Sequence, residues 1–307
     1  MIRKIKYLLL VMMLFSGTYA ASNAGDWLDI APDARSVGMG GSQVAVANDA
    51  FAPYWNPAGI YKKYGFAASN SNIFGLVNYN YGSYIHTFDF GSLGISYLSS
   101  GVDGIKSTTY ASGRPVDSGS TFEATNMAIM LSYATSFQRM INLINKDWDN
   151  PITDSLKVGM NIKYISHKIS TYSATGIGID MGLQYSIYDR VFIGAAIYNR
   201  IPVKLSWNNN IEEEFPKKSK LGLGWSVFDN FLLVADWKYE GYKFKNITVG
   251  AEYVLFDSIA VRIGGNRDYY SAGIGINVYG LKIDTAYTIQ TPAYDYMDPS
   301  IRVSISY

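Results

Sequence analysis

From about Tyr64 to the C-terminus, apolar and polar residues alternate along the chain in short runs. Between Gly176 and Ile187, Ile, Met, Leu and Tyr fill every second position, and Gly, Asp, Gln and Ser fill the positions between them. The same alternation recurs in 156–163, 281–288 and 301–307. Successive side chains of a strand point to opposite faces, so a period of two predicts β-strands. About fourteen candidate strands follow one another in this way.

Alternation alone does not separate a soluble β-sandwich from a membrane barrel, because both have one apolar and one polar face. Here the polar face carries charges in the middle of strands, interleaved with glycines. This pattern suits a wet barrel lumen that is filled by a plug. The mid-strand charges are Lys157, Asp180, Asp236, Glu252, Arg262 and Asp284.

The connections between strands alternate in length, which also favours a barrel. Longer polar loops are expected at 101–121 and 200–214, the second containing Glu212 to Glu214. Short turns on the periplasmic side and long outer loops are typical of outer-membrane barrels. Aromatic residues at one rim, and at the terminal Tyr307, suit a bilayer interface. Short turns follow Phe90, Tyr188, Phe228, Phe256 and Tyr279.

These patterns predict an all-β fold: a transmembrane antiparallel β-barrel of about 14 strands over residues 64–307. Ten residues of tilted strand cover roughly the 25 Å apolar band of an outer membrane. An even strand number brings both ends of the barrel to the periplasmic side. The connection from Gln138 to Ser155 is long for a turn on that side, and we expect a helical turn there.

The first twenty residues have the pattern of a cleaved secretory signal peptide. A basic start is followed by the short apolar run Tyr7–Phe15 and by Thr18-Tyr19-Ala20, with small residues at the −3 and −1 positions. The apolar run is too short to span a bilayer, which takes about 20 residues. We therefore expect cleavage after Ala20 and a place in the outer membrane of a Gram-negative bacterium, with a retained anchor as the alternative.

Residues 21–63 precede the strands. Within them, Asp33–Ile60 shows neither the alternation of a strand nor the periodicity of a helix. This stretch is rich in Gly, Ala and Asn, and Asn48-Asp49 is a suitable cap for a short helix over 50–54. Asn56 stands before Pro57 and is pushed out of the helical region, so the helix should end there. We predict an N-terminal plug (hatch) in the lumen, and the alternative is an ordinary loop. The residues expected to gate a ligand are Gly38, Met39, Gly40, Gly41, Asn56, Pro57, Ala58 and Gly59.

At these residues the sequence resembles the PorV/PorQ family, a branch of the FadL-like outer-membrane barrels. The resemblance rests on ARSVGMGG at 34–41, VAVAND at 44–49 and YWNPAG at 54–59. It implies a fourteen-stranded barrel with an N-terminal hatch. For FadL-like transporters it implies passage of hydrophobic molecules past the hatch and out sideways through the wall. For PorV-like members it implies a role in type IX secretion, with exported proteins as partners.

Composition excludes several other classes. The net charge of +1 gives no basic surface for nucleic acid, and the absence of cysteine excludes disulfides and thiolate metal sites. With only His86 and His167, and no Gly-x-Ser-x-Gly elbow, we predict no enzyme, no catalytic residue and no cofactor. His167 is expected at the rim. We expect a solvated turn and not a calcium-binding loop at Asp147, Asp149, Asn150 and Asp154.

Two functions stay open from the sequence, beside a permanently closed structural barrel. The first is a conduit for a hydrophobic small molecule, with outer-membrane lipid around it. The second is a platform that binds exported protein. A tyrosine-rich run of Tyr79, Tyr81 and Tyr84, and the loop from Tyr294 to Tyr296, could either contact a ligand or belong to the interface belt.

Overall fold

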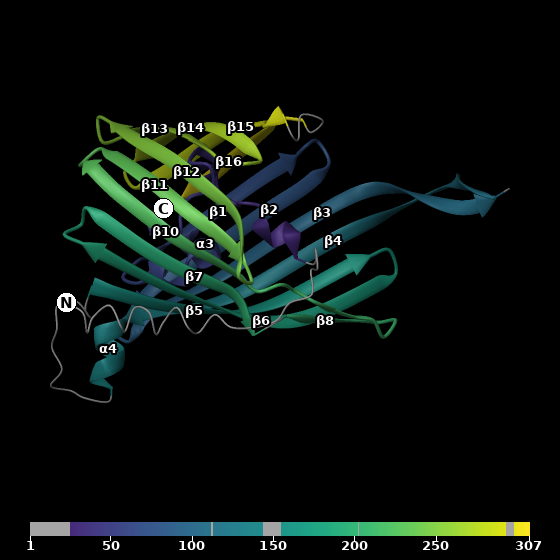
Figure 1. The fold of residues 1–307 in the computed structure, drawn as a ribbon, viewed down its shortest axis with the longest axis horizontal. Coiled ribbons are helices and arrows are strands. Elements are labelled where there is room, and N and C mark those ends of the chain that lie inside the picture. The colour runs from purple at the N-terminus through teal and green to yellow at the C-terminus, as the bar shows by residue number, and fades with distance from the viewer. Residues whose placement is uncertain (1–24, 112, 144–154, 202, 293–297) are drawn as a thin grey trace.

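The computed structural model describes residues 25–111, 113–143, 155–201, 203–292 and 298–307. The predicted signal peptide, the first four residues of the predicted plug, the calcium candidates at 147–154 and the loop from Tyr294 to Tyr296 lie outside these ranges. Within them the fold is a closed barrel of antiparallel strands around a short N-terminal segment (Figure 1).

Fourteen described strands form the wall, as the alternation predicts. Each pairs with its neighbours along the chain, β7 pairs with β10, and β1 pairs with β16 to close the ring. All of these pairings are antiparallel. The wall strands are β1 (Gly65–Ile73), β2 (Val77–Phe88), β3 (Gly91–Ala111), β4 (Arg114–Ser136), β5 (Leu156–Ile169), β6 (Tyr172–Ile187), β7 (Val191–Ile201), β10 (Lys218–Phe228), β11 (Phe231–Glu240), β12 (Lys243–Leu255), β13 (Ile259–Gly265), β14 (Tyr269–Val278), β15 (Leu281–Gln290) and β16 (Ser300–Ser306).

The two faces of the wall separate as the sequence pattern predicts. On β6, Asp180 and Gln184 are buried in the lumen, whereas Ile177 and Met181 are exposed on the outside. The outer face is a continuous surface of Ile, Val, Leu, Met and aromatic side chains over all sides of the ring. Such a surface in water would be a large apolar patch, so it suits lipid.

Short turns gather at one end of the barrel. Three of them place an aromatic residue and its successor at positive φ: Tyr188-Asp189, Phe256-Asp257 and Tyr279-Gly280. Two consecutive residues at positive φ form the mirror-image turn that matches the twist of a tight hairpin. The three aromatic rings stand almost fully exposed at this rim. The predicted aromatic rim on the short-turn side is therefore present.

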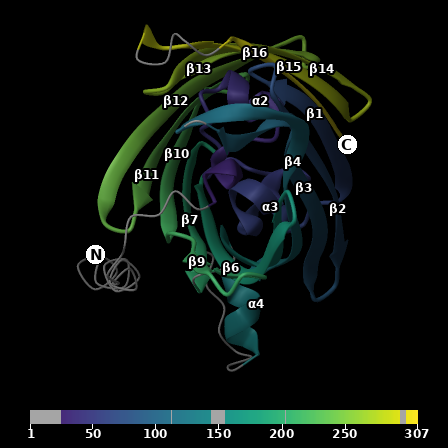
Figure 2. The ribbon, with the colours of Figure 1, turned by 90° about the vertical axis from the view of Figure 1, so that its right-hand side faces the viewer.

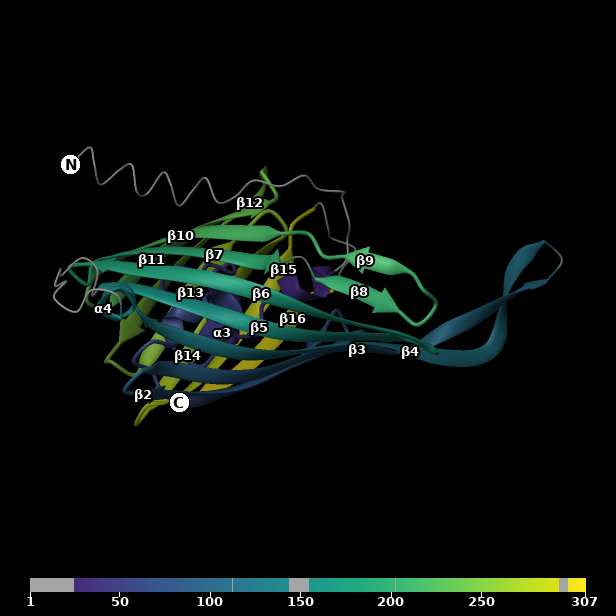
Figure 3. The ribbon, with the colours of Figure 1, turned by 90° about the horizontal axis from the view of Figure 1, so that it is seen from below.

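The expected long loops differ in part from the prediction. Residues 101–111 and 114–121 continue β3 and β4, which project beyond the barrel as a two-stranded ribbon (Figures 1 and 3). The stretch at 200–214 contains a small hairpin of β8 (Lys204–Trp207) and β9 (Glu212–Glu214), attached to the outer part of β6. Backbone pairing within each hairpin outweighs the polar composition that suggested loops. Helix α4 (Phe137–Asn142) begins the connection from Gln138 to Ser155, where a helical turn is expected.

Residues 25–63, which we name the inner segment, lie within the ring of strands (Figure 2). The segment contains η2 (Asp26–Asp29), α2 (Ala34–Gly38), α3 (Ala52–Trp55) and η3 (Pro57–Ile60). It begins near the end that carries the ribbon and reaches β1 at the short-turn end. Its apolar side chains form a buried cluster with lumen-facing residues such as Ile85, Leu98 and Ile165.

No helix among the described residues is long and apolar enough to cross a membrane.

Candidate functional site: the inner segment and the barrel wall

The glycine-rich part of the inner segment lies against β12, β13 and β14. Gly40 and Gly41 have φ of +69° and +88°, and a Cβ built on Gly40 would come within 2.5 Å of the backbone of Gly265. Met39 is fully buried over Gly250 and Gly264. Only glycine allows this approach of two backbones, so Gly38 to Gly41 are fixed to this side of the wall.

Asp33 starts α2 and links it to α3. Its carboxylate accepts hydrogen bonds from the Ser36 amide at 2.8 Å and from the Trp55 indole at 2.7 Å. Burial, with a smaller effect of Asp49, raises the pKa of Asp33 above its usual 3.8. The two short helices are thereby tied together inside the lumen.

Asn56, Pro57, Ala58 and Gly59 lie on the other side of the lumen, against β5, β6 and β7. The Asn56 amide nitrogen donates to the carbonyl oxygens of Val44 and Leu183, each at 2.9 Å. Its side-chain oxygen accepts from Ala58 N at 3.2 Å, so Asn56 ends α3 as predicted and caps η3. A Cβ on Gly182 would clash with Asn56. The eight predicted gating residues therefore form two separate contact regions.

A row of buried charges holds α2 on its side of the wall. Arg35 donates to both carboxylate oxygens of Glu252, at 3.0 and 2.9 Å. Arg262 bridges Glu252 at 2.6 Å and Asp284 at 2.7 Å. We name Arg35, Glu252, Arg262 and Asp284 the ionic row. The sequence places three of these charges mid-strand but suggests a wet lumen, whereas the structure buries and pairs them.

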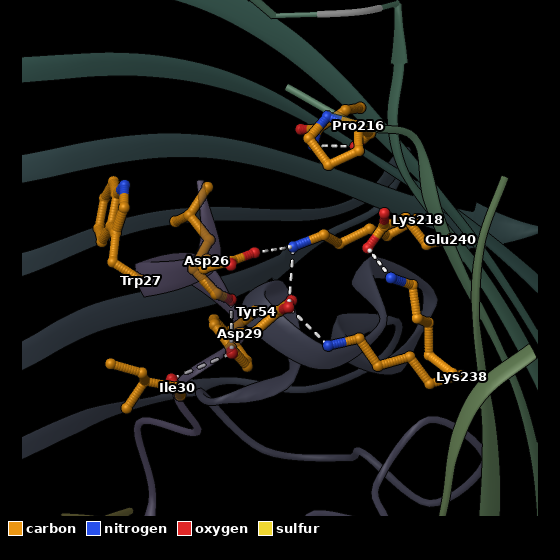
Figure 4. Close-up of polar contacts among 12 residues, drawn as sticks. Asp26, Trp27, Asp29, Ile30, Tyr54, Pro216, Lys218, Lys238 and Glu240 are labelled. Carbon is orange, nitrogen blue, oxygen red and sulfur yellow. Dashed lines mark hydrogen bonds and ion pairs between the residues drawn. The ribbon is translucent and has the colours of Figure 1, made fainter. Parts of the chain in front are cut away.

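A second group of ion pairs ties the start of the inner segment to the outer half of the wall (Figure 4). Lys218 bonds Asp26 at 3.1 Å and Asp29 at 2.8 Å, and Lys238 also pairs with Asp29. Burial alone would raise the pKa of Asp29, but Lys238 and Lys218 outweigh it and hold the pKa below 3.8. We name this group the outer strap.

His167 lies near the outer end of β5, close to the rim where we expected it. It is buried at the outer end and accepts a hydrogen bond from the Trp27 indole at 2.9 Å. Trp207 and Phe215 surround the same ring. His86 lies exposed on β2, so the two histidines do not share a site. The sequence did not indicate the burial of His167, because its partner Trp27 is distant in the sequence.

The tyrosine-rich run on β2 divides by parity. Tyr79 and Tyr81 are buried and donate to the inner-segment carbonyls of Ile30 at 2.6 Å and Ala50 at 3.2 Å. Tyr84 faces outward. The first two tyrosines are therefore contacts of the inner segment, and the third belongs to the outer surface.

A polar cluster that the sequence analysis did not identify lies where β6 and β7 lose register. The pairing shifts between Ile179 and Met181, opposite Asn199, whose φ is +55°. The Asp180 carboxylate pairs with the Lys163 ammonium at 2.7 Å and accepts a hydrogen bond from the backbone N–H of Asn199 at 3.0 Å. A bulge of this kind twists a strand and interrupts its ladder. Asp180 is the one charged residue of β6, and that charge was the available signal.

One cavity lies at this bulge inside the barrel, and another begins beside it on the outer face, at the next pair along, Met181 and Ile197. Inside, a cavity of about 40 Å³ is lined by Lys163, Asp180, Asn199 and the aromatic ring of Tyr54. Outside, a hollow of about 430 Å³ has an almost wholly apolar lining. Its walls are outward side chains of β4 to β7, including Met160, Met181, Leu183, Ala195 and Ile197, and its floor includes Gly159 and Gly182. Pro57 and Asn56 lie directly behind those two glycines. We name this the lateral hollow.

A larger cavity of about 440 Å³, which we name the outer chamber, lies on the β10 to β16 side of the inner segment. Its lining mixes charged side chains with apolar ones such as Ile30, Val37 and Phe74. Among the described residues, no three His, Asp or Glu side chains come together as metal ligands.

The chain is similar in fold to solved transporter barrels. No protein-family model matches it, and neither does any curated protein. The toluene transporter TbuX of Ralstonia pickettii shares 14% identity at a TM-score of 0.60, over 90% of this chain and 97% of that one. The toluene transporter TodX of P. putida shares 13% sequence identity at a TM-score of 0.62, and the match covers 90% of this chain and 97% of that one. A Pseudomonas aeruginosa FadL homologue shares 13% sequence identity at a TM-score of 0.55, with 90% of this chain and 97% of that one covered. The predicted closed barrel of fourteen antiparallel strands is thus confirmed as the fold of this chain.

Proposed function

We propose that the chain is an outer-membrane barrel of the FadL type that passes hydrophobic small molecules, and that it is not an enzyme. In this proposal the inner segment acts as the plug. A molecule entering from the outer end moves past it and leaves sideways into the membrane through the wall at β6 and β7.

The observation that carries this proposal is the coincidence of three features at one place. The ladder between β6 and β7 shifts register beside Asn199. A cavity lies on the lumen side of the shift, and the lateral hollow begins on the lipid side at the next pair, Met181 and Ile197. An apolar molecule in the hollow would replace lipid contacts without exposing polar groups, because its lining is almost free of them.

The fold similarity supports the same function. Two of the similar structures are described as toluene transporters and a third as a FadL homologue. Their sequence identity to this chain, 13 to 14%, supports a shared architecture, so the cargo class is our inference from the hollow.

Within this proposal the eight predicted residues divide into two roles. Asn56 to Gly59 stand behind the lateral hollow and form the movable side, which withdraws from Gly159 and Gly182 when a molecule passes. Gly38 to Gly41, pressed into β12 to β14, form the fixed side. A membrane around the outer surface, lipid as a partner and export by the predicted signal peptide belong to the same proposal.

A reversible cross-link of the exit tests the proposal. The chain has no cysteine, so Met181→Cys with Ile197→Cys gives one possible disulfide. These residues are directly paired on β6 and β7 and both line the hollow. In Gram-negative cells lacking their own hydrocarbon and fatty-acid uptake barrels, we expect the oxidised variant to lose uptake of radiolabelled toluene and of a long-chain fatty acid. Reduction should restore it.

The matched control is Ile263→Cys with Ala272→Cys, a directly paired position on β13 and β14 at the opposite side of the ring. This disulfide should leave uptake unchanged. Equal uptake by the oxidised exit variant and the oxidised control would contradict lateral exit at β6 and β7. Uptake equal to that of cells without the barrel, for every variant, would contradict the transport function itself.

Binding of exported proteins in type IX secretion stays a prediction of the sequence resemblance. A pull-down from detergent-solubilised membranes tests it, and recovery of no exported protein would count against it.

A further inference from the structure

The lateral hollow follows two neighbouring rows of outward residues, which pair directly across β4, β5, β6 and β7. In that strand order the rows are Tyr133, Met160, Met181 and Ile197, and, nearer the short-turn end, Thr135, Val158, Leu183 and Ala195. Among the described residues of the lining, Met140 of α4 is the one that does not belong to these strands. The hollow is therefore formed by the wall and by the helix that follows β4.

Thr135 is the last outward residue of β4, and it is buried. Alternation along β4 places it on the same face as Leu131 and Tyr133. Leu131 is 56% exposed, whereas Thr135 is 2% exposed. The chain turns into α4 directly after Ser136, and this helix packs against β4 and β5. Thr135 thus lies at the closed end of the hollow, away from the bulk of the lipid.

Two hydroxyl groups occur among the described residues that line the hollow, and only one of them is satisfied. The Tyr133 hydroxyl donates to the carbonyl oxygen of Phe90 at 2.9 Å. Thr135 Oγ1 has no hydrogen-bond partner within the described part of the chain. A buried hydroxyl without a partner is costly, and a ligand atom that bonds it recovers that cost.

The size and the charge of the hollow limit what fits it. An apolar cavity of about 150 Å³ is enough for benzene. The lateral hollow, at about 430 Å³, has room for an aromatic ring with an alkyl chain. None of the described lining residues is charged, so a charged head group would lose its water without gaining a counter-charge. These features fit an apolar molecule with one neutral oxygen.

We propose that the lateral hollow prefers apolar molecules that carry one neutral oxygen, such as an alcohol or a phenol, and that Thr135 recognises this oxygen. The Thr135 hydroxyl is able to donate to the oxygen or to accept from its proton. A pure hydrocarbon enters the same hollow but leaves the hydroxyl unsatisfied, so it binds more weakly. The inference rests on the proposed function, because it assigns the preferred cargo of the proposed exit.

Isothermal titration of the purified barrel tests this preference. The probes are 4-hexylphenol and hexylbenzene, which differ only in the hydroxyl group. The detergent is lauryldimethylamine oxide, which has no hydroxyl or carbonyl group of its own, and empty micelles give the reference. The quantity compared is the ratio of the two dissociation constants. Thr135→Val removes the hydroxyl at nearly the same shape, and it should reduce the preference for the phenol by about threefold to tenfold, the effect of one hydrogen bond.

Thr135→Ser keeps the hydroxyl and should keep the ratio of the unchanged protein. Ser71→Ala is the matched control, because Ser71 Oγ is also buried without a partner among the described residues but lies on β1, outside the hollow. This variant should keep the ratio too. Heat-modifiable migration on electrophoresis verifies folding. Thr135→Ala also lacks the hydroxyl, and it replaces Thr135→Val should that variant fail to fold.

The outcomes separate this inference from the proposed function. Saturable binding of both probes with the same ratio in Thr135→Val, Thr135→Ser and the unchanged protein would overturn the role of Thr135 and leave the transport of hydrophobic molecules standing. Absence of saturable binding of either probe would also overturn the preference. The uptake of toluene and fatty acid by cells then decides separately whether the barrel transports at all.

Discussion

The inner segment meets the barrel wall in two different ways on its two sides. On the β12 to β15 side, α2 is held by the ionic row, in which Arg35, Glu252 and Arg262 alternate in charge. On the β5 to β7 side, Asn56 bonds a wall carbonyl and its side chain fills the space above Gly182. One side is held by paired charges and the other by close packing. The difference indicates that attachment on the β12 to β15 side depends on charge, whereas attachment on the β5 to β7 side depends on side-chain volume.

The largest effect is expected from breaking the ionic row. Glu252→Gln replaces the carboxylate that the Arg35 and Arg262 guanidinium groups share with a neutral amide. Breaking a buried ion pair costs about 3 to 5 kcal/mol, because the remaining charge is left unpaired. Urea unfolding in detergent, followed by tryptophan fluorescence, measures this loss. Glu123→Gln breaks an exposed pair with Lys168 as the control and should change the free energy of unfolding by less than about 1 kcal/mol.

A smaller but distinct effect is expected on the packed side. Gly182→Ala adds one methyl group where Asn56 leaves no room. Overpacking of this kind costs about 1 to 3 kcal/mol. Gly82→Ala is the matched control, because the added Cβ on β2 would meet no atom within 4 Å. If Gly182→Ala had the same free energy of unfolding as the unchanged protein, Asn56 could move aside without cost.

The two sides should also be energetically independent. Glu252 and Gly182 share no bonded partner and lie on different sides of the inner segment. The double variant should therefore lose the sum of the two single losses to within about 0.5 kcal/mol. A larger departure from the sum, measured by the same unfolding experiment, would mean that the inner segment transmits strain from one side to the other.

The outer strap gives the smallest effect, and it depends on pH. Asp29 is ionised and paired at neutral pH, and Asp29→Asn should lower the free energy of unfolding by about 1 kcal/mol there. Because the folded pKa lies below 3.8, this contribution persists down to that pH and disappears only as the pH falls further. Unfolding curves of both proteins from pH 7 to pH 3 check this. A difference that vanishes above pH 5 would contradict the lowered pKa.

The sequence predicts the wall well because alternation is a local property. The strand over 172–187 and its division into Ile177 and Met181 outside, Asp180 and Gln184 inside, follow from a period of two. The helix end at Asn56 follows from the proline beside it. These features need no knowledge of distant residues.

The site is less predictable because its contacts join residues far apart in the chain. Arg35 meets Glu252, and Trp27 meets His167, through the closure of the ring. The sequence indicates charges on the lumen face, but it does not indicate which ones pair. Nor does it show that Arg302 Nε and Nη1 have no hydrogen-bond partner among the described residues, because this depends on every neighbour of Arg302 at once.

The seam between β1 and β16 joins the first and last strands of the chain, and Tyr307 N bonds Phe66 O across it at 2.9 Å. The ring therefore cannot close before β16 (Ser300–Ser306) is available to pair with β1. The inner segment is attached directly to β1, so we expect it to enter the lumen before or during that last pairing step. If the ring closed first, the inner segment would have to enter a finished barrel. The order of the strands therefore favours an assembly in which β1 and β16 pair last.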